Sequence, residues 1–132
     1  MNRQRHVPDD GSTSVQYAIT LGLFLLLFFA AIQTGLWWYS RSVCLTAARQ
    51  GVQAGRTVGG TPADAEATAR SFLSRAGLGI VTDTTVVASF DGDNVRVTVS
   101  GAAVRLLPMG NLSISQSASG PKERYTTPGG PR

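Results

Sequence analysis

A long uncharged and apolar segment near the N-terminus is the feature that most constrains this chain. Residues 11–40 contain no Asp, Glu, Lys or Arg, and Tyr17–Tyr39 reads YAITLGLFLLLFFAAIQTGLWWY. As a helix rising about 1.5 Å per residue, such a run is long enough to cross a hydrocarbon core of about 30 Å. A core helix of a soluble domain would be shorter and would carry a polar stripe. The sequence therefore predicts a membrane-spanning helix over residues 14–40, preceded by a polar head over residues 1–13.

Aromatic residues gather at the far end of this segment. Trp37, Trp38 and Tyr39 stand where an interfacial aromatic belt is expected, and Arg41 follows them. We interpret these four residues as anchors in the headgroup layer, so membrane lipid is an expected partner. A secretory signal peptide is the competing interpretation, but its apolar core would be shorter and a small-residue cleavage site would follow it. Basic residues flank the segment on both sides, so charge alone does not select an orientation.

Beyond the apolar run the helical period continues and the pattern becomes amphipathic. Over residues 41–60 polar and apolar side chains separate onto two faces, so one helix would run from near Ser14 to near Val58. Small residues at four-residue spacing let another backbone approach closely. We expect a packing partner on this face, either the chain's own sheet or a neighbouring subunit; a loosely packed helix is the other interpretation. The small residues are Ala31 and Gly35 in the apolar run, and Ala47, Gly51 and Gly55 beyond it.

A small α+β domain is expected over residues 61–119. Thr61-Pro62 is typical of a helix start, and Gly77 would end that helix. Alternating Val and Thr residues around the turn Asp91–Asn94 predict a hairpin, and a third strand follows. The predicted fold is therefore α+β, with a long N-terminal helix, a short second helix and a three-stranded antiparallel sheet, and the Pro- and Gly-rich tail over residues 120–132 is predicted to be disordered. The expected strands are Thr82–Phe90, Val95–Val99 and Leu112–Gln116.

The composition excludes several classes of function. The chain has 12 basic and 8 acidic residues and a formal net charge of +4, but the basic residues are scattered, so we expect no nucleic-acid partner. His6 is the only histidine and lies in the polar head, so we expect no His-based catalytic site, no metal site and no cofactor, and we interpret the protein as non-enzymatic. Cys44 is the only cysteine; it is interpreted as a packing residue, with lipidation or an intermolecular disulfide left open.

The order of these features resembles the TadE-like family, the pseudopilin-like components of tight-adherence pilus assembly in bacteria. The resemblance covers the glycine before the apolar helix, the helix itself, the run Ala47–Gly55 and the two later strands Val95–Val99 and Leu112–Ser119. It implies a pilin-like arrangement, a plasma-membrane location with the head in the cytoplasm, and a role in pilus assembly or secretion. It also implies partners among other pilin-like or pilus-assembly membrane subunits.

The resemblance further implies a prepilin-type peptidase as a partner. Cleavage would fall between Gly11 and Ser12, and Gln16 would then occupy the fifth mature position, where the family pattern has glutamate. An amide can form hydrogen bonds, but it cannot neutralise a neighbour's buried N-terminal amine. Three interpretations stay open: an uncut anchor, a cut minor subunit, or an assembly that uses other contacts. A membrane-anchored binding module unrelated to pili is the alternative function.

Overall fold

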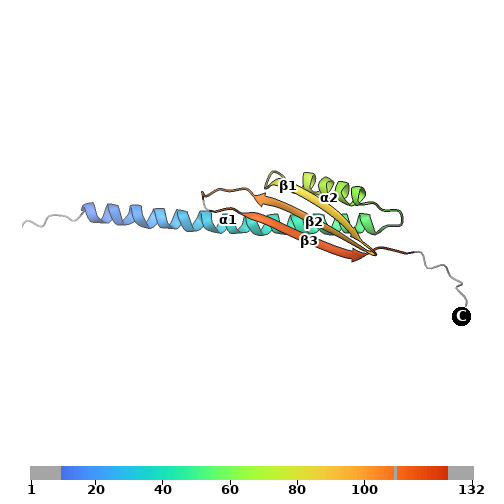
Figure 1. Ribbon diagram of the computed structural model, residues 1–132. Helices are drawn as coiled ribbons and strands as arrows, with labels where there is room; N and C mark the ends of the chain where they lie inside the picture. Colours follow the sequence, from blue (N-terminus) through green and yellow to red (C-terminus); the bar gives the residue numbers. More distant parts are fainter. Residues whose placement is uncertain (1–9, 109, 125–132) are drawn as a thin grey trace, which may run out of the picture.

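The computed structural model describes residues 10–108 and 110–124, and it confirms the predicted α+β fold (Figure 1). One very long helix carries a small domain on its second half only, while its first half extends alone. The domain consists of a shorter helix and three strands that lie alongside the long helix (Figure 1). The elements in chain order are α1 (Asp10–Arg56), α2 (Pro62–Ala76), β1 (Val81–Asp91), β2 (Asn94–Ala103) and β3 (Ser113–Pro121).

Helix α1 is continuous over 47 residues, so the apolar run and the amphipathic run form one element. It begins at Asp10, four residues before the expected start near Ser14. It ends at Arg56, close to the expected Val58. Gly59 adopts φ 82, a left-handed conformation that glycine tolerates best, and this turns the chain toward α2.

Helix α2 begins with a capping box. The Thr61 hydroxyl accepts a hydrogen bond from the Asp64 amide at 3.2 Å, and the Asp64 carboxylate accepts one from the Thr61 amide at 3.0 Å. These two bonds satisfy backbone donors that the helix start leaves without partners. Pro62 occupies the first turn, and Gly77 follows the last residue, as the sequence predicted. The buried residues of this helix are Ala65, Ala69 and Leu73.

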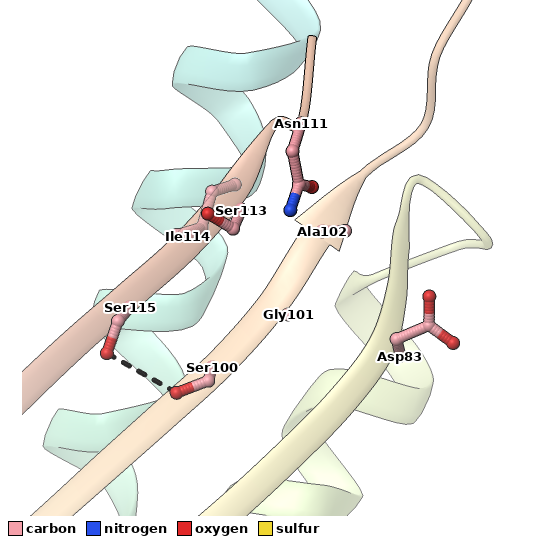
Figure 2. Close-up of a pocket in the computed structure, with 8 residues that line it drawn as sticks. All are labelled: Asp83, Ser100, Gly101, Ala102, Asn111, Ser113, Ile114 and Ser115. Atoms are coloured by element: carbon pink, nitrogen blue, oxygen red, sulfur yellow. Dashed lines mark hydrogen bonds between the residues drawn. The ribbon is translucent and has the colours of Figure 1, made fainter.

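The three strands form an antiparallel sheet in the order β1-β2-β3. Gly92, at φ 57, lies in the tight turn of the predicted hairpin, and Phe90 pairs with Val95 beside it. All three strands are longer than expected. On the outer face of the sheet, the hydroxyls of Ser100 and Ser115 lie 3.3 Å apart across β2 and β3 (Figure 2).

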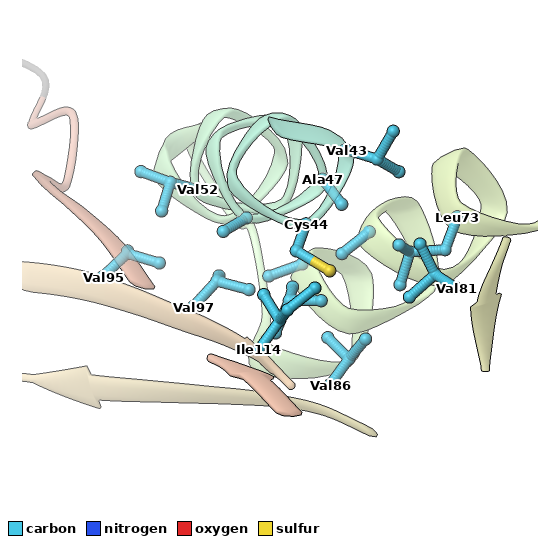
Figure 3. Close-up of a cluster of buried hydrophobic side chains, with 14 of the residues drawn as sticks. Val43, Cys44, Ala47, Val52, Leu73, Val81, Val86, Val95, Val97 and Ile114 are labelled. Atoms are coloured by element: carbon cyan, nitrogen blue, oxygen red, sulfur yellow. The ribbon is translucent and has the colours of Figure 1, made fainter. Parts of the chain in front are cut away.

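The core lies where the sheet and α2 cover the second half of α1. Figure 3 shows Cys44 of α1 directed toward the sheet that holds Val97 of β2, with Leu73 of α2 on one side of the core. Alternate side chains of β2 point into this layer and are wholly buried, because the strand is in the middle of the sheet. The fully buried core residues are Cys44, Ala47, Ala48, Ala65, Ala69, Val95, Val97 and Val99.

The segment after β3 differs from the sequence-based expectation. Gly120 and Pro121 belong to β3, although the sequence placed them in a disordered tail. The Lys122 amide donates to the Asp93 carbonyl at 2.6 Å, and the Glu123 amide donates to the Arg56 carbonyl at 3.0 Å. These bonds tie the end of β3 to the hairpin turn and to the end of α1. Residues 125–132 lie outside the described residues, as do residues 1–9, which include His6.

Candidate membrane helix and its junction with the domain

The first half of α1 is an uncovered apolar cylinder. Every residue from Gly11 to Phe29 is exposed, and Phe24, for example, keeps 65% of its surface accessible. This is the one helix in the described part of the chain that is long and apolar enough to cross a membrane, and its most apolar window has a mean hydropathy of 2.2 and is 0% buried. Exposing an apolar patch of this size to water is unfavourable. The patch is therefore expected to be covered by lipid or by other apolar helices.

Polar side chains within this apolar stretch are partly satisfied by the helix itself. The Thr34 hydroxyl donates to the Ala30 carbonyl at 2.9 Å, and the Ser40 hydroxyl donates to the Leu36 carbonyl at 2.8 Å. Such bonds to the preceding turn lower the cost of placing a hydroxyl in an apolar environment.

Gln33 of α1 is joined to the domain by two hydrogen bonds of its side chain. Its side-chain amide donates to the Val104 carbonyl at 3.1 Å, and its oxygen accepts the Leu106 amide at 2.8 Å. Both polar atoms of one side chain therefore hold the chain segment that leaves β2. In the sequence, Gln33 is only an interruption of the apolar run. Its polar amide near the end of that run was the one indication that it would form this contact.

Of the predicted aromatic anchors, Trp37 and Tyr39 contact the domain, whereas Trp38 lies at the surface. Trp37 is partly buried against the domain core, and the Tyr39 hydroxyl donates to the carbonyl of Ala76, at the end of α2, at 3.2 Å. Trp38 remains 68% exposed. The Arg41 guanidinium lies 5.7 Å from the centre of the Trp37 ring, within the range of a cation–π contact. The domain thus reaches into the expected span of residues 14–40.

The small residues of the second half of α1 lie against the chain's own domain. A methyl group added to Gly51 would come within 2.8 Å of the Ala65 carbonyl oxygen in α2. One added to Gly55 would come within 2.9 Å of a Val95 methyl group in β2. Ala47 is wholly buried in the same interface. Glycine and alanine at these positions let α1 approach both layers closely.

The remaining predicted positions lie on the uncovered half of α1. Ala31 and Gly35 are exposed, and a methyl group added to Gly35 would meet no atom within 4 Å. Gly11 and Ser12 lie in the first turn of the helix, and Gln16 follows in the second. All three are exposed. The small residues therefore fall into two groups: those of the second half of α1 contact the chain's own domain, and those of the apolar run are exposed.

Two carboxylates of α2 hold local structure in place. The Glu66 carboxylate accepts the Ala88 amide of β1 at 3.0 Å and pairs with Arg70 at 2.9 Å, while Arg70 donates to the Val86 carbonyl at 3.3 Å. The bond from the Ala88 amide, together with Arg70, lowers the pKa of Glu66. The bonds from Thr61 similarly lower the pKa of Asp64.

Burial has the opposite effect on the one cysteine. Cys44 is wholly buried, and desolvation raises the pKa of its thiol. A buried neutral thiol is a poor nucleophile, which agrees with its interpretation as a packing residue.

The outer face of the sheet offers an open depression. Figure 2 shows it at the end of the sheet near Ser113, with Asp83 on β1 and Asn111 beside β3; its volume is about 470 Å³. Asp83 has φ 51 and lies where the pairing of β1 with β2 shifts register. Within the described sheet the only aromatic residue is Phe90, which packs against the core, so no aromatic patch marks this face for ligand binding. Between residues 10 and 124, position 109 excepted, no group of three His, Cys, Asp or Glu residues could hold a metal ion.

Over residues 10–108 and 110–124, the structure consists of a small α+β domain carried on one helix that is long and apolar enough to span a membrane. The family model described as TadE-like protein matches residues 11–53, which cover the bare half of α1 and most of its covered half. The match confirms the resemblance to the TadE-like family over this segment. Helix α2 and the sheet lie outside the match, and no curated protein and no solved structure matches the chain.

Proposed function

We propose that this protein is a structural, non-enzymatic membrane component of a bacterial tight-adherence-type pilus or a related secretion apparatus. It would act as a minor pseudopilin or assembly factor in the plasma membrane, with its N-terminus in the cytoplasm and its domain outside. The observation that carries the proposal is the bare apolar half of α1, which lies in the segment that the TadE-like family model matches. The domain covers only the second half of α1, so the first half is the surface left for lipid and for helices of other subunits.

Contacts with those subunits are assigned to Ala31 and Gly35. The glycines at positions 51 and 55 are occupied by the chain's own domain, whereas nothing lies within 4 Å of a methyl group added to Gly35. Small residues four positions apart on a membrane helix allow close approach of a second helix, and the association energy comes from van der Waals packing. Partner helices would therefore meet α1 near the level of Gln33, where the bare half of the helix ends.

The test is recovery of partner subunits from native membranes. Replacing both Ala31 and Gly35 with Leu should reduce co-purification of pilus-assembly proteins, because the larger side chains keep the helices apart. Gly22→Leu is a matched control: it also meets no atom within 4 Å, and it lies about 140° around the helix from Gly35. Unchanged recovery with the double variant would contradict the assignment.

Processing by a prepilin-type peptidase is a further part of the proposal. The bond between Gly11 and Ser12 lies in the first turn of α1, where local opening costs least because helix ends fray. Cleavage there would leave Gln16 at the fifth position. The intact mass and N-terminal sequence of the protein from its native membrane decide this point. A start at Ser12 supports a cut minor subunit, whereas a start at Met1 contradicts cleavage and leaves a permanent anchor.

A further inference from the structure

The connection between β2 and β3 lies next to the end of the bare helix. We propose that this segment, residues 104–108 together with Gly110 and Asn111, rests in the lipid interface and sets the height of the domain on the membrane. The inference depends on the proposed membrane span, but it adds a contact site that lies in the domain. Its partner is the boundary between lipid headgroups and acyl chains, not another protein.

The placement follows from the two hydrogen bonds of Gln33. They fix the carbonyl of Val104 and the amide of Leu106 against α1, one residue beyond the exposed side chain of Ile32. Helix from Ser14, where the expected span begins, to Ile32 is about 29 Å long, which matches the thickness of a hydrocarbon core of about 30 Å. The level of Gln33 is therefore the level at which the bilayer interface begins. In Figure 1 this connection is the part of the domain that reaches furthest toward the bare helix.

The chemistry of the connection fits an interface. Leu106 remains 49% exposed although it is held by a backbone bond, and Leu107 beside it is only partly buried. Arg105 is exposed, and its guanidinium donates a long hydrogen bond of 3.4 Å to the Gly110 carbonyl. Its guanidinium is therefore available to lipid phosphates, while apolar neighbours enter the acyl boundary. The segment contains no acidic residue that would oppose a negative membrane surface.

The opposite end of the domain has a different character. Its turns are formed by Thr57–Thr61 and by Gly92-Asp93, and the polar residues Lys122–Arg124 pack beside them. Among the described residues, Val58 is the one large apolar side chain exposed there. It follows the end of α1 at Arg56, which lies about 35 Å along the helix from Gln33 and so beyond the reach of the bilayer surface. This difference between the two ends gives the domain one face that suits lipid.

The test measures depth in a bilayer with the full chain. Single cysteines at positions 26, 58 and 106 carry an environment-sensitive fluorophore, and the protein is reconstituted in phosphatidylcholine vesicles containing phosphatidylglycerol. Cys44 is 0% exposed, so the unsubstituted chain serves as the blank for labelling. Spin-labelled lipids then report depth by quenching. We expect strong quenching at position 26, none at position 58, and quenching at position 106 closer to that at position 26.

The outcomes separate this inference from the membrane span itself. Quenching at position 26 without quenching at position 106 overturns the lipid contact and leaves the span intact. No quenching at position 26 overturns the span, and with it the inference. A blue-shifted but unquenched label at position 106 would mean contact with protein, which also contradicts the proposal. Gln33→Ala should release the segment, so that quenching at position 106 falls while quenching at position 26 is retained.

Discussion

The close approach of α1 to its own domain makes Gly51→Ala the most informative substitution. Alanine is favoured over glycine in a helix interior by about 1 kcal/mol, so a loosely packed helix would be stabilised. In this structure the new methyl group would lie 2.8 Å from the Ala65 carbonyl oxygen and 3.2 Å from carbons of Ala69 and Val97. The nearest atom belongs to the backbone of α2, which cannot move aside as a flexible side chain would.

Overpacking of this kind costs about 1–3 kcal/mol, which exceeds or cancels the gain in helix propensity. We expect a net destabilisation of about 1 kcal/mol, or a fall in Tm of about 4–8 °C for a domain of this size. Thermal unfolding of the full chain in detergent micelles, followed by circular dichroism, measures the shift. Gly35→Ala is the control, because its methyl group meets no atom within 4 Å and the variant should be at least as stable as the parent. A Gly51→Ala protein more stable than the parent would refute the close packing.

Three further substitutions test single contacts of the domain. The pKa of Glu66 is lowered in the folded state, so its carboxylate contributes stability above its ordinary pKa of 4.5, and this stability is lost as the pH falls. Glu66→Gln should therefore weaken the dependence of the free energy of unfolding on pH below about pH 5, measured by denaturant unfolding. An unchanged pH dependence in the variant would contradict this. Thr61→Ala removes the cap acceptor for Asp64 and should cost about 1 kcal/mol in the same assay, with a negligible loss counting against the capping box. Gln33→Ala should increase amide exchange at Leu106, and full protection in the variant would show that the Gln33 bonds do not hold the segment.

Local sequence signals were sufficient for the elements of this fold. The length of the apolar run, the Thr61-Pro62 start of α2 and the turn around Gly92 each act within a few residues, so pattern and capping chemistry locate them. The start of α1 and the end of β3 were less accurate. Gly120 and Pro121 look like tail residues by composition, but pairing with β2 places them in the sheet.

The contacts that join these elements could not be predicted from the sequence, because they link distant positions. No local pattern indicated that Gln33 would bind residues 71 and 73 positions away, or that the carboxylate of Glu66 would accept the Ala88 amide. The small-residue spacing predicted a packing partner for Gly51 and Gly55, but it left open whether that partner was the chain's own sheet or another subunit. Only the folded arrangement places α2 and β2 against these glycines.

The topology of the chain in its native membrane tests the central claim most directly. Single cysteines at position 58 and at position 4 are exposed to a membrane-impermeant thiol reagent in intact spheroplasts and again after permeabilisation, and the membranes are washed with alkaline carbonate. We expect that the protein stays in the membrane, that position 58 is labelled in intact spheroplasts, and that position 4 is labelled only after permeabilisation. Release by carbonate would contradict a spanning helix, and labelling of position 4 alone in intact spheroplasts would contradict the proposed orientation.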